Sequence, residues 1–403
     1  MNAKKIAAWA GGAIALLIVL VIAAAYLIQQ NTFLHRYLLG KMIQAAEKSS
    51  GARISIRDFG IRWIPLLVTL DDVTVRGTED NTVRPLASLP HAEIGIEWGA
   101  LLRKRVNLTE LILDRPAVNL VINDTGQSNL PARPASSSAP SNGLQINVQH
   151  AVVRGGELRY NNLPRKIDAD LANFHLDINH SVLGDQYSGN LGYTKGVVDV
   201  AGYAPLRHDI QIGFAATRSG IAFERIHVGT ESSQLNAKGN IQGYSNPVIQ
   251  AEYQALLSTA ELHRELPAVP LSEGEIELDG SVAYDGALGS GLEALKTSGR
   301  VSSKTFRASV YKTELGVRSL GADYSLAAGT IRVSNLEAET LGGVLRAQFT
   351  GERLMQLRAI DFRFPRIRFH WDRRSRLQVL VRFHCEAQPI SARARTGFRM
   401  WKT

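Results

Sequence analysis

The chain contains 403 residues, of which 45% are hydrophobic and 21% are charged, and it has a single cysteine. This composition excludes collagen-like and wholly disordered chains. One cysteine also excludes an intrachain disulfide framework and a CxxC metal site. The formal net charge of +9 lies entirely in residues 352–403, which hold 13 basic and 4 acidic side chains. The rest of the chain is balanced, so we expect no nucleic-acid partner.

An uncharged hydrophobic stretch, Ile6–Ile28, lies close to the N-terminus. As a helix rising about 1.5 Å per residue it reaches about 34 Å, enough to cross the hydrocarbon core of a bilayer. The alternative is a cleaved signal peptide ending at Ala23–Ala25. Signal peptides have a shorter hydrophobic region, about 7–15 residues long. We therefore predict that residues 1–29 form a single transmembrane anchor.

The charges that flank this stretch are nearly balanced, with Lys4 and Lys5 before it and Arg36 and Lys41 after it. The positive-inside rule alone therefore does not decide the orientation. A short tail before the span and a long domain after it favour a cytoplasmic N-terminus, with the body across the membrane.

Residues 30–50 show helical spacing of apolar side chains. These are Phe33, Leu34, Tyr37, Leu38, Met42, Ile43 and Ala46. Gly51 is a suitable end for such a helix. We predict an amphipathic juxtamembrane helix, which either lies at the lipid interface or caps the β-structure that follows.

From Ala52 onward the apolar residues recur with a period of two. The clearest examples are Gln145–Gln149, Asn173–Asn179, Asp209–Phe214, Glu275–Asp279 and Ile331–Ser334. Strict alternation is typical of antiparallel strands with one buried face. Turn signals separate the strands, at residues 123–126, 154–156, 243–247 and 285–286. We predict a mainly β fold, in which many hairpins add one after another to a long, curved, antiparallel-type sheet behind the transmembrane helix.

Few helices interrupt this body. Ser258–Leu266 has Ser258 as its N-cap and Glu261 three residues later, which is a capping box. A Pro/Ser/Ala segment, residues 131–143, has no packing residues and reads as a linker. It separates a first β unit, residues 51–130, from a second and longer one, residues 144–351.

A sheet with one apolar face must cover that face. Two coverings remain open: a second sheet, which gives a closed sandwich, or lipid acyl chains lying in an open trough. The strands use mainly Ile, Leu, Val, Ala and Gly and few large aromatic residues, which favours the trough. The candidate groove residues are Ile146, Val148, Val152, Phe174, Leu176, Ile178, Ile210, Ile212, Phe214, Ile276, Leu278 and Val282.

Several segments resemble proteins of the AsmA superfamily. After the N-terminal span come Gly51–Ile56 and Leu66–Val75, and then Val106–Leu130. The last segment has an apolar strand, an Asp-x-Pro, an alternating strand, a turn glycine and Asn-Leu. The matching positions are Asp114, Pro116, Val118, Leu120, Gly126, Asn129 and Leu130. Val152–Asn162 is similar to the start of the superfamily's second unit.

Within the superfamily, the chain is most similar to the N-terminal part of the TamB-like group, the inner-membrane components of the translocation and assembly module. The resemblance covers about residues 1–351 and implies an inner-membrane anchor with a periplasmic β-trough. It also implies a role in outer-membrane biogenesis, either moving phospholipid along the trough or helping outer-membrane protein assembly with an outer-membrane partner. The terminal domain that contacts this partner in the TamB-like group has no counterpart here.

Residues 352–403 differ in character from the body. Arginines alternate with aromatic residues, as in Phe362–Phe369. Such a pattern suits single-stranded nucleic acid or an anionic membrane surface. We favour a third explanation, a shifted reading frame or truncated gene, because strand alternation ends near Thr350 and arginine outnumbers lysine 12 to 1. We predict poor packing in this tail.

No catalytic signature is present, and we predict a non-enzymatic protein without a metal or cofactor. The ten histidines are scattered and form no HExxH motif. Residues 289–294 match a GxGxxA pattern in letters only, because no long helix can follow before Gly299. Asp71 and Asp72 are neighbours on opposite faces of a strand, so they cannot act on one substrate.

Overall fold

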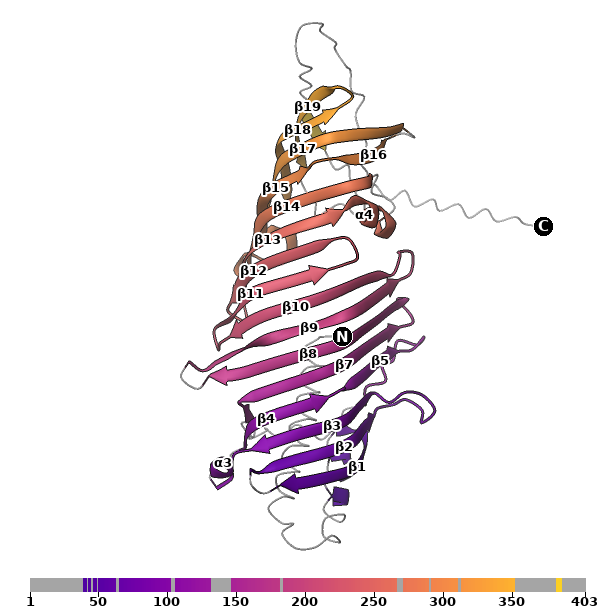
Figure 1. The fold of residues 1–403 in the computed structure, drawn as a ribbon, viewed down its shortest axis with the longest axis vertical. Coiled ribbons are helices and arrows are strands. Elements are labelled where there is room, and N and C mark those ends of the chain that lie inside the picture. Colours follow the sequence, from indigo (N-terminus) through magenta and orange to yellow (C-terminus); the bar gives the residue numbers. More distant parts are fainter. Residues whose placement is uncertain are drawn as a thin grey trace, which may run out of the picture. The chain divides into compact units, whose positions relative to one another are not determined.

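The computed structural model describes residues 39–351, apart from residues 42, 45, 49, 63–64, 103–105, 132–145, 182–183, 267–270, 290 and 311–312, together with residues 382–385. Strands dominate, helices are few and short, and most strand pairs are antiparallel, so the predicted fold class is confirmed in these respects (Figure 1). The chain divides into two compact units. The first comprises Met1–Tyr244 and Ala255–Val269, and the second comprises Ser245–Gln254 and Pro270–Thr403.

The predicted span Ile6–Ile28 lies outside the described residues, as does most of the predicted juxtamembrane helix. Within the described part of the chain, no helix has the length and hydropathy needed to cross a bilayer. Helical residues occur between Leu39 and Ser50. Their end at Gly51 agrees with the expected stop, since the Gly51 amide donates to the Glu47 carbonyl at 2.8 Å and Gly51 has a positive φ of 69°.

The first unit is a single hydrogen-bonded sheet. Its elements are β1 (Arg53–Arg62), β2 (Leu67–Arg76), β3 (Ala87–Ile96), α3 (Trp98–Leu102), β4 (Val106–Asp114), β5 (Ala117–Ile122), β6 (Ile146–Val148), β7 (His150–Asn162), β8 (Ile167–Ser181), β9 (Gln186–Val200), β10 (Leu206–Ala216), β11 (Gly220–Gly229) and β12 (Gln234–Gln242). From β1 to β4 and from β7 to β12, consecutive strands pair antiparallel.

One junction in this sheet is parallel. β4 pairs with β6 and β7, and β5 also pairs with β7, all in the parallel sense. The expectation of hairpins that add one after another is wrong at this junction. Parallel neighbours need a connection of a dozen or more residues, and the segment between β5 and β6 has that length because it includes the predicted linker, residues 131–143. The domain boundary predicted at this linker stays a prediction.

The glycine pair at residues 154–156 is a second difference. The sequence predicts a turn, but the chain continues through it as strand β7. Gly155 has a φ of 63°, and the register with β8 shifts between Val153 and Gly156. A residue in the left-handed region, which glycine adopts without strain, produces a β-bulge instead of a reversal.

The closed core of the first unit lies over strands β1–β4. Leu66, Val68, Leu70 and Leu108 are at most 1% exposed. They belong to one cluster of buried apolar residues, against which Leu39 of the preceding helical segment packs. The amphipathic segment before the sheet therefore supplies a side chain to this core.

The second unit repeats the antiparallel pattern. Its elements are β14 (Leu271–Asp285), β15 (Leu295–Ser303), β16 (Phe306–Val310), β17 (Thr313–Ala327), β18 (Thr330–Thr340) and β19 (Gly343–Gly351), with single 3₁₀ turns at Gly286–Leu288 and Gly291–Glu293. β15 and β16 each pair with both β14 and β17, so they lie end to end between these two longer strands. β13 (Val248–Ser258) contributes residues to both units.

The tail is described only at β20 (Arg382–Cys385), which pairs in parallel with β19. The other residues of 352–403 lie outside the described residues. The proposal of a shifted reading frame or truncated gene, and the expected poor packing, stay predictions.

The predicted capped helix is confirmed as α4 (Thr259–Glu265). The Ser258 hydroxyl accepts from the Glu261 amide at 3.4 Å, as a capping box requires. The Glu261 side chain, 6% exposed, turns instead to the β11–β12 turn. Its carboxylate accepts hydrogen bonds from the hydroxyls of Thr230, at 2.7 Å, and Ser233. A buried carboxylate thus attaches this short helix to the sheet.

We predict that Glu261→Gln weakens this attachment by about 1–3 kcal/mol, because a charged acceptor of two hydroxyl protons is lost from a buried position. Burial opposes ionisation of Glu261, but the hydrogen bonds from Ser233 and Thr230 together with Arg264 lower its pKa overall. Its contribution is therefore complete above the ordinary pKa of 4.5 and is lost as the pH falls through the lower folded-state value.

Amide hydrogen exchange of α4 and of residues 230–233 measures this effect. Glu231→Gln is the matched control, because Glu231 is exposed and its one ion pair among the described residues is with Arg264, at 3.1 Å. An exposed ion pair contributes at most about 1 kcal/mol. Equal loss of protection in both variants would contradict the special role of Glu261.

Candidate functional site: an apolar sheet face with a polar cavity at its rim

The core face of the first unit continues without interruption across the sheet. Residues directly opposite one another in a ladder project on the same side. One such row, read from β4 to β11, is Leu113, Val153, Leu176, Leu191, Ile212 and Ile226. Leu113 also packs against the closed core. We call this side of the first unit the apolar face.

The apolar face is more deeply buried at one end than at the other. Over β1–β4 many of its side chains are buried, but on β7–β12 they are only half-buried. Among the described residues between Ala151 and Glu293, no hydrophobic side chain is fully buried. The sheet thus presents branched aliphatic side chains that no other described element covers completely.

The opposite side of these strands is polar. In β8, His175, Asp177 and Asn179 are exposed and alternate with the apolar residues. His150 approaches Glu110 at 3.5 Å and Asp177 at 3.3 Å, so polar side chains contact one another across neighbouring strands of this side. The polar side of these strands is therefore exposed to water. Only their apolar side requires burial against another apolar surface.

Most of the predicted groove residues of the first unit share the apolar face. These are Val148, Phe174, Leu176, Ile178, Ile210, Ile212 and Phe214. Val152 is the exception, because it lies opposite Asp177 and therefore on the polar side. Ala151–Val153 are three apolar residues in a row. Without alternation of apolar and polar residues, the sequence did not show on which side of the sheet Val152 lies. Ile146 belongs to β6, but its side chain lies outside the described residues.

In the second unit the predicted residues Ile276, Leu278 and Val282 alternate with exposed residues along β14 and are half-buried. Between Leu278 and Val282 the same face contains Gly280, which lies opposite Gly299.

A pair of tyrosines lies over these two glycines. The Tyr253 and Tyr324 hydroxyls hydrogen-bond to each other, and Tyr253 also bonds to the Thr297 hydroxyl at 3.2 Å. A methyl group added at Gly280 would lie 2.9 Å from the Tyr324 hydroxyl. Burial and the bond to Tyr253 raise the pKa of Tyr324, so the Tyr324 hydroxyl is uncharged at neutral pH.

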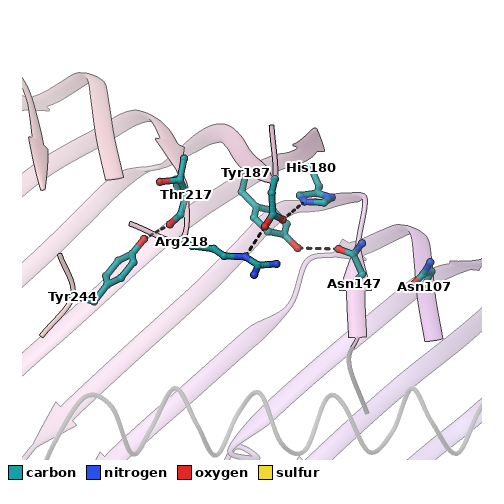
Figure 2. A pocket seen from close by; sticks show the side chains of 9 residues that line it. Asn107, Asn147, His180, Tyr187, Thr217, Arg218 and Tyr244 are labelled. Carbon is teal, nitrogen blue, oxygen red and sulfur yellow. Dashed lines mark hydrogen bonds and ion pairs between the residues drawn. The ribbon is translucent and has the colours of Figure 1, made fainter. Parts of the chain in front are cut away.

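A polar cavity of about 590 Å³ lies at the rim of the apolar face, where several strands of the first unit end (Figure 2). The row His180–Tyr187–Ala216 belongs to its lining. The next row of the apolar face is Ile178, Gly189 and Phe214. The His180–Tyr187–Ala216 part of the cavity wall therefore lies one row beyond Ile178, Gly189 and Phe214, on the same side of the sheet.

Two opposite charges meet in this cavity. Arg218 Nε lies 2.5 Å from Asp185 Oδ2, and His180 Nε2 lies 3.3 Å from Asp185 Oδ1. The His180 hydrogen bond and the Arg218 charge lower the pKa of Asp185, so it is ionised at neutral pH. Arg218 is 90% exposed and its terminal nitrogens have no partner among the described residues.

Aromatic rings complete the cavity wall. The imidazole of His180, whose side chain is 7% exposed, stacks on the Tyr187 ring with centroids 4.4 Å apart. The Tyr187 hydroxyl donates to Asn147 at 3.1 Å, and Tyr244 donates to the Thr217 carbonyl at 2.6 Å. Sequence reasoning missed this group, because its members come from hairpin ends far apart in the chain. The only signal was a polar residue, His180, on the apolar register of β8.

These features define a class of protein: a mainly β chain with a one-sided sheet, part of whose apolar face is only half-buried. Among the described residues no cluster of three potential metal ligands occurs. The model of the AsmA family matches residues 1–311, and the chain belongs to this family. Comparison with curated proteins gives no match.

Proposed function

We propose that this protein moves phospholipid, with the acyl chains lying along the apolar face of its sheet. The supporting observation is that the apolar rows of β7–β12 are half-buried, although the row through Leu113 continues to Ala92 and Leu70, which are each 1% exposed. Exposed apolar area costs about 25 cal/mol per Å², and large contiguous apolar patches on soluble proteins mark sites that another apolar surface occupies.

The dimensions agree with an acyl chain as the occupant. Neighbouring strands lie about 4.8 Å apart, so β7–β12 extend over about 24 Å. One leaflet of a bilayer is about 15 Å thick in its hydrocarbon part. The face therefore accommodates the full length of a chain across its strands, and aliphatic side chains interact with acyl chains without a directional requirement.

Membership of the AsmA family agrees with a role in the cell envelope and in outer-membrane biogenesis. Within that role we propose an inner-membrane protein of the TamB-like type, anchored by Ile6–Ile28 with its N-terminus in the cytoplasm and its sheet in the periplasm. Help in outer-membrane protein assembly, through an outer-membrane partner, is a further part of the proposal. The phospholipid and the inner membrane are the partners it requires.

Photo-crosslinking in cells tests the proposal. A photoreactive residue at Phe174, Leu176 or Ile212 should capture phospholipid, and so should one at Leu278. The matched controls are Asp177 and Gln211, which neighbour two of these positions but project on the polar side. Capture of other segments of the chain alone at the apolar positions would instead support the alternative, a closed β-sandwich that acts as an envelope scaffold.

A further inference from the structure

We infer that the rim cavity of the first unit binds the zwitterionic headgroup of a phospholipid, with its phosphate on Arg218 and its ammonium group on Asp185. This inference rests on the proposed function, because it assigns the head of the molecule whose chains lie on the apolar face. It identifies a binding site and a lipid class that the apolar face by itself does not select.

The position of the cavity supports an amphipathic ligand. Ile178 and Phe214 are two residues before His180 and Ala216 on their strands, and successive rows are about 6.6 Å apart along a strand. Gly189 lies between Ile178 and Phe214 in the last apolar row. A side chain at position 189 would collide with the Asp177 carbonyl. The middle position of this row therefore has no side chain above the backbone. An acyl chain can pass over Gly189 and bring its head into the cavity.

The charges in the cavity suit a head that contains both signs. Arg218 uses Nε for Asp185 and leaves its terminal N–H groups for a phosphate, which guanidinium groups bind in a bidentate manner. Asp185 is ionised and 51% exposed, so it can accept from an ammonium group as well. Because these two charges cancel, the cavity does not favour a purely anionic head.

The aromatic rings fit the same assignment. Tyr187 and Tyr244 line the cavity on either side of Arg218 (Figure 2). Both hydroxyls donate to partners in the protein, so both rings are fixed. An ammonium group near the face of a tyrosine gains about 0.5–1 kcal/mol at an exposed site. A phosphate alone gains nothing from these rings, which distinguishes a lipid head from inorganic phosphate.

The test uses the full chain in nanodiscs that contain equal amounts of phosphatidylethanolamine and phosphatidylglycerol, with a photoreactive residue at Ile212. The wild-type protein should capture mainly phosphatidylethanolamine. Arg218→Gln should lower this preference about tenfold, since a hydrogen bond to a charged group is lost. Asp185→Asn should shift capture towards phosphatidylglycerol, because the cavity becomes cationic.

Arg207→Gln is the matched control, because Arg207 is exposed on β10 and projects on the polar side. Capture at Ile212 with unchanged lipid preference in both cavity variants overturns the headgroup site and leaves the proposed function in place. No lipid capture at Ile212 in any protein overturns the proposed function itself. Millimolar inorganic phosphate that abolishes the preference shows a simple anion site and also overturns the zwitterionic assignment.

Discussion

Replacing Leu176 with arginine should reduce the phospholipid that copurifies with the protein by about tenfold or more. Leu176 lies in the middle of the apolar row that crosses β4 to β11. A cation placed against acyl chains costs about 2–4 kcal/mol at the centre of a hydrocarbon layer, and every 1.4 kcal/mol is a factor of ten in occupancy. Lipid phosphorus per mole of purified protein measures the loss.

Asp177→Arg is the control for this experiment. Asp177 is the next residue of the same strand, is exposed, and lies on the polar side. The substitution adds the same side chain to the same strand but leaves the apolar face unchanged, so lipid content should stay at the wild-type level. Equal lipid loss in the two variants would mean that arginine disturbs the strand itself, and the assignment of the apolar face would lose its support.

The second large effect is expected in the closed core. Leu70→Ala should destabilise the β1–β4 part of the sheet by about 2–5 kcal/mol, the range for deleting a fully buried leucine. Leu70 is 1% exposed and belongs to the buried cluster with Val68 and Ile94. Hydrogen exchange of the β2 and β3 amides reports this local stability, which a single global unfolding transition of a two-unit chain does not resolve.

Leu191→Ala is the matched substitution on the open part of the same face. Leu191 is half-buried between Leu176 and Ile212, so the same change should cost about 1 kcal/mol in the lipid-free protein. The difference between the destabilisation caused by Leu70→Ala and that caused by Leu191→Ala measures how much more tightly the face is packed in the core than over β7–β12. Similar losses at both positions would show that the open rows are as tightly packed as the core, which contradicts a trough.

The strand pattern was well predicted where alternation is strict. Asn173–Asn179 lies within β8 and alternates between half-buried and exposed residues as expected. The short helix was also predicted, because Ser258 caps it locally by accepting from the Glu261 amide. Both patterns depend on interactions between near neighbours in the chain. Such interactions can be predicted from the sequence without knowledge of the tertiary structure.

Prediction failed where the decisive partner is distant. Ala151–Val153 is apolar throughout, and only the pairing of Val152 with Asp177 places it on the polar side. The bulge at Gly155 looks like a turn in sequence, since a left-handed glycine serves in both. The parallel junction of β4 and β5 with β7 depends on which strands the chain joins after the long connection that follows β5. The composition of that connection does not predict which strands these are.

The sequence by itself determined that the body of this protein is a one-sided sheet, because a period of two fixes which residues share a face. Tertiary structure decided how deeply that face is buried: many of its side chains are buried over β1–β4, and they are half-buried over β7–β12. It also decided that Asp185 and Arg218 meet beside His180 at the rim. Both depend on strand register and hairpin length, which set the positions of residues far apart in the chain.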